Sequence, residues 1–222
     1  PTQFGPKEDF IKYPRDFGRD RKLLSEAGVD AIFYPKAGQI YPKGYKTYIY
    51  VSDLSDIMCG KSRPGHFRGV ATVVAKLFNI VKPSKAYFGE KDFQQQVIIK
   101  KMARDLNMDV EVVSLPIIRE ANGLAMSSRN TYLNPEEREN ALVINGALKY
   151  AKVLVKSGVR NSVTVKTAIK KMMKTVRSLK VDYITICDPK TLEEKKIIKG
   201  KTLIAIAVYI GRTRLIDNIV VD

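Results

Sequence analysis

A short stretch at residues 89–95, Gly-Glu-Lys-Asp-Phe-Gln-Gln, collects residue types that bind phosphorylated ligands. Gly89 lets the backbone approach a ligand closely, Lys91 can place a positive charge on a phosphate, and Asp92 can accept hydrogen bonds from ribose hydroxyls. A helix expected to follow adds the positive end of its dipole. A structural interpretation also fits, because Asp92 and Gln95 have the spacing of a capping box. A cap requires neither Gly89 nor Lys91, which favours a binding function.

A second candidate for anion binding is the tripeptide Ser127-Ser128-Arg129. The two serines offer hydroxyls and backbone N–H groups, and Arg129 offers a planar fork of donors that matches phosphate oxygens. The tripeptide falls in a predicted connection between two domains, where small-molecule sites are common. Because such tripeptides are frequent on protein surfaces, the pattern alone leaves binding and structure open.

A third candidate is the loop-like segment 59–69, CGKSRPGHFRG, which precedes a predicted helix. Arg63, His66 and Arg68 could all face an anion from it. A single histidine ahead of a helix has a structural role more often than a catalytic one, so both interpretations remain. Near the start of the chain, Gln3 could present its amide to a substrate.

The composition excludes several classes of protein. Cys59 and Cys187 form neither a disulfide framework nor a Cys-x-x-Cys metal site, and the single histidine, His66, excludes a multi-histidine metal centre within the chain. We therefore expect no protein metal site and a reducing, cytoplasmic location. No apolar stretch approaches the roughly 20 residues that span a bilayer, and the first residues do not resemble a signal peptide.

The net charge of +16 attracts phosphate, either in nucleic acid or in a nucleotide. Most of the surplus is lysine on predicted helices, which is typical of a solvated face. The sequence has no zinc-finger spacing, aromatic RNA-binding motif or basic heptad region, so we expect no specific nucleic-acid partner.

The order of predicted elements indicates a doubly wound α/β domain over residues 1–117. Apolar β-branched residues at 110–113 suggest a parallel sheet that is covered on both faces. The predicted elements are a helix at 16–27, strands at 30–34 and 46–51, a helix at 67–80, a strand at 85–88, a helix at 93–106 and a strand at 109–115.

The pattern changes after Pro116. Asn134, Pro135 and two glutamates form a strong helix start, which predicts a long helix to about Ser157. A helix at 165–179 and strands at 182–187, 203–209 and 214–220 should follow. Helices followed by a small antiparallel sheet predict a separate α+β domain over residues 118–222.

Taken together, four segments resemble motifs of the pantoate–β-alanine ligase family. They are PTQFGPKEDFIKYPR, CGKSRPGHFRGV, YFGEKDFQQ and GLAMSSRNTYL, and they occur in the order of that family. The resemblance extends over nearly the whole chain. It implies a Rossmann-like nucleotidyltransferase domain with a smaller C-terminal lid domain, ATP and Mg²⁺, a homodimer and a cytoplasmic location.

The resemblance also implies a two-step reaction and a set of site residues. The carboxylate of pantoate attacks the α-phosphate of ATP to form pantoyl adenylate, and the amine of β-alanine then displaces AMP. Phosphate charge would be neutralised, as catalytic groups, by Lys91, Ser127, Ser128 and Arg129. ATP would contact Gly89, Glu90, Lys91, Asp92, Ile118, Met126, Ser127, Ser128 and Arg129, with Ile118 near the adenine. Gln3 and Gln95 would hold pantoate, Gln3 could also serve β-alanine, and Arg63 and His66 match positions near the site.

One departure from the family pattern concerns a His-x-Gly-His segment that the family carries upstream of the PTQF motif. The chain begins at PTQF, and its only histidine belongs to another motif. On this ground we expect the parallel-sheet domain to lack its N-terminal part and the 222-residue chain alone to be inactive. Two alternatives remain: another adenylate-forming or nucleotidyl-transferring enzyme of the same superfamily, and a basic nucleic-acid-binding protein.

Overall fold

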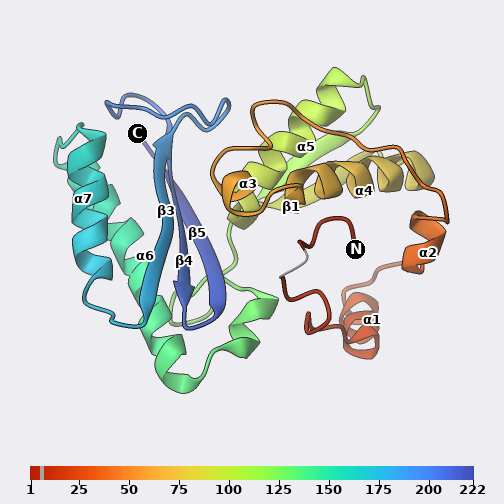
Figure 1. The fold of residues 1–222 in the computed structure, drawn as a ribbon, viewed down its shortest axis with the longest axis horizontal. Helices are drawn as coiled ribbons and strands as arrows, with labels where there is room; N and C mark the ends of the chain where they lie inside the picture. Colours follow the sequence, from red (N-terminus) through yellow and green to blue (C-terminus); the bar gives the residue numbers. More distant parts are fainter. Residues whose placement is uncertain (6–7) are drawn as a thin grey trace.

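A computed structural model describes residues 1–5 and 8–222 (Figure 1). Its elements form two groups. One group contains β1, β2 and the helices α3, α4 and α5, and the other contains β3, β4, β5, α6 and α7. In Figure 1, α1 and α2 lie beside the first group, on the side where the chain begins. The described residues include no helix that is long and apolar enough to cross a membrane.

The first group follows the predicted order of helices and strands in most places. Asp16, predicted as the first helical residue, instead caps the first helix, since its side chain accepts a hydrogen bond from the N–H of Arg19. The elements are α1 (Phe17–Glu26), α2 (Ala37–Ile40), α3 (Cys59–Ser62), α4 (His66–Val81), β1 (Lys85–Gly89), the 3₁₀ turn η1 (Glu90–Asp92), α5 (Phe93–Asp105) and β2 (Glu111–Leu115).

The strands β1 and β2 pair in parallel, with Ala86 opposite Val112, as the sequence predicts. On one face, Ala86 and Val112 pack on a core formed largely by α4 and α5. On the other face, Tyr87 has 60% of its surface exposed. The expected sheet covered on both faces is therefore wrong for the described residues.

Two predicted strands are absent from the described residues. Residues 30–34 belong to no helix or strand, and Phe33 and Tyr34 are exposed. Residues 46–51 bond to a side chain instead of a strand, since the N–H of Ile49 donates to the hydroxyl of Thr72 on α4 at 2.9 Å. An apolar or aromatic run forms a strand only where a neighbouring strand completes its hydrogen bonds.

The second group confirms the strong helix start. Asn134 and Glu137 form a complete capping box, and the helix ends before Gly158, whose φ is 96°. The elements are the 3₁₀ helix η2 (Ser128–Tyr132), α6 (Pro135–Lys156), α7 (Ser162–Met173), β3 (Leu179–Cys187), β4 (Thr202–Ile210) and β5 (Thr213–Val221).

The helix α7 differs from its predicted bounds of 165–179 at both ends. It begins earlier because the side chain of Asn161 caps it by accepting hydrogen bonds from the N–H groups of Val163 and Thr164. It ends earlier because Leu179 already pairs with Ile210 as the first residue of β3. The helix is thus shorter than predicted because the residues near 179 pair in the sheet.

The three-stranded sheet is antiparallel, with the order β3-β4-β5. Along β4, Ile204 and Ile206 pack into a core with α6 and α7, whereas Leu203 and Ala205 pack into the core of the first group. This alternation follows from the two-residue period of a strand. The sheet therefore lies between the two groups of helices. The division at residues 117–118 remains a proposal, and one core extends across it.

Candidate active site

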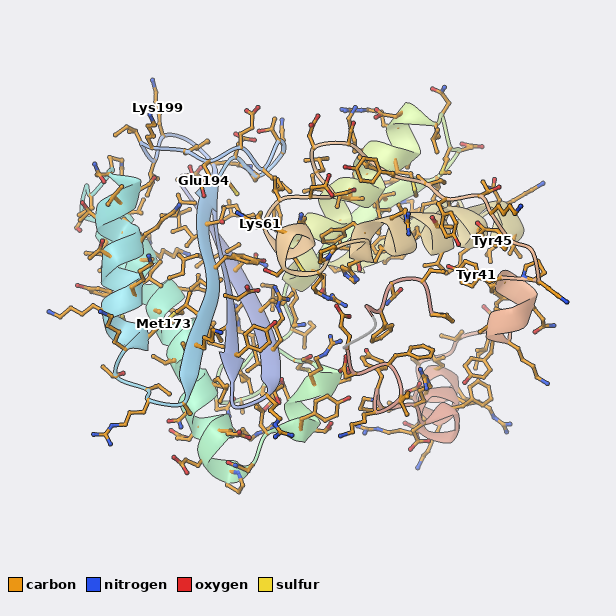
Figure 2. All side chains as sticks on the ribbon, in the orientation of Figure 1. Tyr41, Tyr45, Lys61, Met173, Glu194 and Lys199 are labelled. Carbon is orange, nitrogen blue, oxygen red and sulfur yellow. The ribbon has the colours of Figure 1, made fainter. Side chains whose placement is uncertain are left out.

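A cleft of about 1420 Å³ opens between the two groups of elements. Figure 2 shows side chains from both groups reaching into the space between them. Seven of the residues singled out from the sequence line this cleft. They are Arg63, His66, Lys91, Asp92, Gln95, Ser127 and Arg129.

The other candidates are not among the residues that line the cleft. The carbonyl oxygen of Gln3 contacts His66, and the hydroxyl of Ser128 donates to the hydroxyl of Tyr13 at 3.0 Å. Ile118 and Met126 are neighbours, since the N–H of Met126 donates to the carbonyl of Ile118 at 3.0 Å. Both side chains are more than half exposed, at 66% and 54%. They offer an apolar surface that a planar group can cover.

The turn at residues 89–92, called the lysine turn below, connects the carboxyl end of β1 to α5. This is the end of a parallel strand at which ligands bind in α/β proteins. Lys91 keeps 20% of its side chain exposed, and its Nζ lies 3.9 Å from Oδ2 of Asp92. A Cβ added at Gly89 would meet no described atom within 4 Å, so the backbone there is open to a ligand.

The alternative interpretation of Asp92 and Gln95 as a capping box does not hold among the described contacts. Asp92 does precede α5, but among the described contacts its side chain accepts no capping hydrogen bond. The 3₁₀ turn ahead of the helix gives Asp92 a φ of −91° and a ψ of 59°, outside the extended conformation usual for a capping residue. Its carboxylate is half exposed at the cleft, which leaves it available to a ligand.

Gln94, next to the lysine turn, shapes the loop ahead of α3. Its buried amide donates to the carbonyls of Leu54 and Ile57, both at 2.8 Å, and accepts from the N–H of Cys59 at 3.0 Å. The loop also passes so close to Gly60 that an added Cβ would lie 1.8 Å from the carbonyl oxygen of Ser55. These contacts fix the direction in which α3 presents Arg63 to the cleft.

The hydrogen bonds of His66 define its tautomer. Its Nε2 lies 2.9 Å from NH1 of Arg63, and because a guanidinium only donates, Nε2 must accept. Its Nδ1 then carries the proton and donates to the carbonyl of Gln3 at 2.7 Å. Burial and the adjacent Arg63 charge lower the pKa of His66 to about 4. His66 is therefore neutral at pH 7 and anchors the Gln3 segment.

Gly69 completes this anchor one turn further along α4. A Cβ at this position would lie 2.2 Å from the carbonyl oxygen of Thr2 and 2.6 Å from the N–H nitrogen of Gln3. Only a glycine permits the backbone of residues 2–3 to lie directly on the helix. The segment 59–69 thus acts on Gln3 through His66 and Gly69, which clarifies a role that the sequence leaves open.

Two carboxylates occupy the arginine forks of the cleft. Arg63 donates to both oxygens of Glu8, at 2.8 and 2.5 Å, and Arg129 donates to both oxygens of Asp9, each at 2.9 Å. Burial alone would raise the pKa of each carboxyl, but the hydrogen bonds and charge of its arginine outweigh burial and lower it. The paired hydrogen bonds show that each guanidinium is oriented to donate to two oxygens of one anionic group. Pro6 and Lys7, in the same sequence motif, lie outside the described residues.

Sequence reasoning missed three residues that connect the cleft walls. On β5, Asp217 pairs with both terminal nitrogens of Arg119, at 2.7 and 2.9 Å. Its neighbour Asn218 bonds to the lysine turn, and both β5 residues line the cleft. Asp217 and Asn218 are adjacent polar residues that interrupt the apolar run at 215–221 of β5, and that interruption is the signal that could have indicated them.

The positive charge of the chain lies partly away from this cleft. Figure 2 shows Lys199 on the connection between β3 and β4, where its side chain points outward from the edge of the molecule. Charges of this kind are solvated and add little to a binding site.

Comparison with known proteins identifies relatives over the whole chain. A family model described as pantoate-beta-alanine ligase matches residues 1–220. Pantothenate synthetase from Moorella thermoacetica is 52% identical over 222 residues, which are 100% of this chain and 78% of that protein. Pantothenate synthetase from Caldicellulosiruptor saccharolyticus is 54% identical over 222 residues, with 100% and 79% covered.

Solved structures agree. Pantothenate synthetase from Thermus thermophilus superposes with a TM-score of 0.96 at 44% identity, over 99% of this chain and 79% of that one. Pantoate-beta-alanine ligase from Francisella tularensis, solved with beta-gamma ATP and beta-alanine, gives a TM-score of 0.79 at 34% identity, over 99% and 75% of the two chains. The α/β nucleotidyltransferase-like fold is thereby established, and the chain belongs to the pantoate–β-alanine ligase family.

Proposed function

We propose that this cleft joins pantoate to β-alanine with consumption of ATP. The observation that carries the proposal is that Lys91, Gln95 and Arg129 line one cleft although they come from both groups of elements. Membership of the family supports the ligation itself. The Francisella tularensis relative, whose structure was solved with beta-gamma ATP and beta-alanine, supports ATP as a substrate.

The reaction proceeds in two steps. A carboxylate oxygen of pantoate attacks the α-phosphorus of ATP, the bond to the bridging oxygen breaks, and pyrophosphate leaves. The amine of β-alanine then attacks the acyl carbon of pantoyl adenylate, loses a proton and displaces AMP. Negative charge develops on phosphate oxygens in the first step, so preorganised cations are the main catalytic contribution expected of the protein.

Each candidate residue has a role in this scheme. Lys91 and Arg129 neutralise phosphate charge, aided by the hydroxyls of Ser127 and Ser128. Asp92 accepts hydrogen bonds from the ribose, and its carboxylate is not used by a cap. Gln3 and Gln95 hold pantoate through amides that can both donate and accept. Ile118 is assigned to the adenine. Gly89, Glu90 and Met126 are assigned to further contacts with ATP.

Arg63 and His66 take indirect roles in the scheme. The ring of His66 has both nitrogens engaged and a pKa of about 4, so it holds Gln3 in place and transfers no proton at neutral pH. Arg63 fixes the His66 tautomer and offers its fork to an anionic group. Gly69, on which residues 2–3 rest, supports the same arrangement.

Mg²⁺ would enter the cleft as part of the ATP complex. No cluster of three or more metal-ligating side chains is found among the described residues. That suits an ion held mainly by substrate phosphates and water, with one or two protein carboxylates. Asp92 is the half-exposed carboxylate beside the proposed phosphate site. The metal supplies additional charge neutralisation at the phosphates when it is bound.

Replacement of Lys91 tests the proposal. In a pantoate-dependent exchange of pyrophosphate with ATP, assayed in a protein that carries the family's His-x-Gly-His segment ahead of residue 1, Lys91→Ala should lower the rate by roughly 100- to 1000-fold, as loss of a preorganised charge does. Lys61→Ala is the matched control, because Lys61 is exposed on α3 (Figure 2) and does not line the cleft. Equal rates in the Lys91 variant and the control would contradict the assignment.

Replacement of Gln95 tests the assignment of the acid substrate. Gln95→Ala should raise the KM for pantoate by roughly 10-fold or more and leave the KM for ATP nearly unchanged, because one lost amide contact to a charged group costs about 1.5–3 kcal/mol. The same assay with other small carboxylic acids separates this function from that of another adenylate-forming enzyme. Faster exchange with a different acid would contradict pantoate as the substrate.

The assembly and location also follow the family as proposals. We expect a cytoplasmic homodimer in which residues 118–222 act as a lid over residues 1–117. Light scattering should give twice the subunit mass at micromolar concentration. A monomer under these conditions would contradict the dimer but not the chemistry.

A further inference from the structure

Asn218 makes an unusual contact between distant parts of the chain. This residue lies on β5 and is 5% exposed. Its side-chain nitrogen donates to the carbonyl oxygen of Glu90 at 2.9 Å and to that of Lys91 at 3.0 Å. A side-chain amide has two hydrogens on its nitrogen, and both are used here on successive carbonyls of the lysine turn.

The lysine turn depends on this contact because it has little apolar packing. None of the residues Glu90–Asp92 is buried, and Asp92 makes no capping hydrogen bond within the described structure. The direction of the Lys91 side chain follows from the orientation of its own peptide groups. Two hydrogen bonds to adjacent carbonyls fix that orientation relative to β5.

Asp217 extends the same contact to the other wall of the cleft. It is 4% exposed, and its Oδ1 accepts from the N–H of Asn218 at 2.8 Å as well as from Arg119. Arg119 also donates to the carbonyl of Gly123 at 3.1 Å, within the segment that leads to residues 127–129. The buried carboxylate is paired and fully hydrogen-bonded, which makes it a rigid centre.

We propose that Asn218 is a positioning residue that holds the lysine turn against β5, while Asp217 and Arg119 hold the segment before Ser127. Two neighbouring residues of one strand thereby align two phosphate-binding segments that are far apart in the sequence. Asn218 acts through the backbone of the turn and touches no substrate. The catalytic part of this inference rests on the proposed function, and the structural part does not.

The decisive variant is Asn218→Asp, which keeps the size of the side chain and removes both donors. Amide hydrogens of residues 89–96 in the full chain should exchange at least roughly 10-fold faster, because the turn loses both hydrogen bonds to β5. A factor of ten corresponds to a loss of about 1.4 kcal/mol of local stability. Exchange in α6 and β4 should stay as in the parent chain. In the exchange assay with pyrophosphate, kcat should fall by roughly 10- to 100-fold, as a small misplacement of a catalytic group causes.

The matched control is Asn140→Asp on α6, where the amide makes only a 3.4 Å bond to the hydroxyl of Ser178 among the described contacts. It should alter neither the exchange of residues 89–96 nor kcat. Asn218→Ser retains one donor, and its exchange and kcat should lie between those of the parent and Asn218→Asp. This second variant decides the question if Asn218→Asp does not fold.

Separate results overturn the two proposals. Parent-like exchange at residues 89–96 in Asn218→Asp, or in Asn218→Ser if the first variant is unfolded, would overturn the positioning role. A uniform loss of protection over the whole chain would overturn it as well, because that is the result of a merely structural residue. Absence of pantoate-dependent exchange in a protein that carries the family's His-x-Gly-His segment ahead of residue 1 would overturn the proposed function, and the hydrogen-exchange comparison would still decide the role of Asn218.

Discussion

The two sheets of this protein are stabilised in different ways. The strand β4 buries both faces, with Leu203 and Ala205 in one core and Ile204 and Ile206 in the other. The parallel pair β1–β2 buries one face among the described residues and leaves Tyr87 exposed on the other. The antiparallel sheet thus gains its stability from apolar area on both sides.

The surroundings of the parallel pair depend instead on a few buried polar contacts. Gln94 holds the loop before α3, His66 holds the Gln3 segment, and Asn218 holds the lysine turn. Hydrogen bonds are directional, and an unpaired buried partner is costly, so such contacts specify position more strictly than apolar area does. The difference teaches that the rigid frame and the precise placement of site residues come from separate parts of the molecule.

The largest expected effect is on the antiparallel sheet. Leu203→Ala should lower the free energy of unfolding by about 2–5 kcal/mol, because it leaves a cavity where α4, α5 and the sheet meet. Tyr87→Ala, on the exposed face of β1, should change it by about 0.5 kcal/mol or less. Urea denaturation of both variants measures the contrast, and equal losses would break the comparison.

The next effect concerns acid stability and the single histidine. In the unfolded chain His66 binds a proton near pH 6.5, whereas its pKa in the fold is about 4. Above pH 6.5 the group contributes no pH dependence. As the pH falls from 6.5 towards 4, the unfolded state is favoured by up to about 3 kcal/mol.

His66→Asn removes this titration and should flatten the pH dependence of unfolding within that window by up to one proton. The carboxyl groups of Glu8 and Asp9 have lowered pKa values in the fold. They add a loss of stability in both chains once the pH falls below their pKa in the unfolded chain. Urea titrations at several pH values between 7 and 4 measure the difference in slope. Identical slopes in parent and variant would show that His66 is protonated normally in the fold.

A smaller effect is expected at Gln94. Gln94→Ala leaves the carbonyls of Leu54 and Ile57 and the N–H of Cys59 without their partner, which should cost about 1–3 kcal/mol. Asn140→Ala, which breaks one long bond on α6, should cost less than about 0.5 kcal/mol. A neutral Gln94 variant would show that polar contacts are dispensable around the parallel sheet.

Features set by neighbouring residues could be predicted from the sequence. The cap at Asn134 depends on a side chain three residues from its partner, and it is confirmed. The pairing of β1 with β2 follows from a strand–helix–strand pattern of about thirty residues. The residues of the lysine turn and Arg129 were proposed for the site because their types suit phosphate, and the family resemblance connected them.

Features that depend on distant partners could not be predicted. Arg129 and Asp9 are 120 residues apart, and Asn218 lies 128 residues from Glu90. The apolar run at 30–34 has the composition of a strand, but its state depends on a pairing partner that local composition does not reveal. The face of β4 that packs on α6 and α7 cannot be told from the opposite face by sequence, because both faces are largely apolar.

The carboxylates of Glu8 and Asp9 have a consequence for how this cleft responds to salt. Most cationic sites release dissolved ions when an anion binds, and their affinity falls steeply as salt is added. Here the counter-ions of Arg63 and Arg129 are covalently part of the chain. A phosphate that takes an arginine fork displaces a tethered carboxylate, and the solution gains no ion. We expect the affinity for ATP to vary less with salt than the net charge of +16 suggests, and Asp9→Asn to restore a steeper dependence.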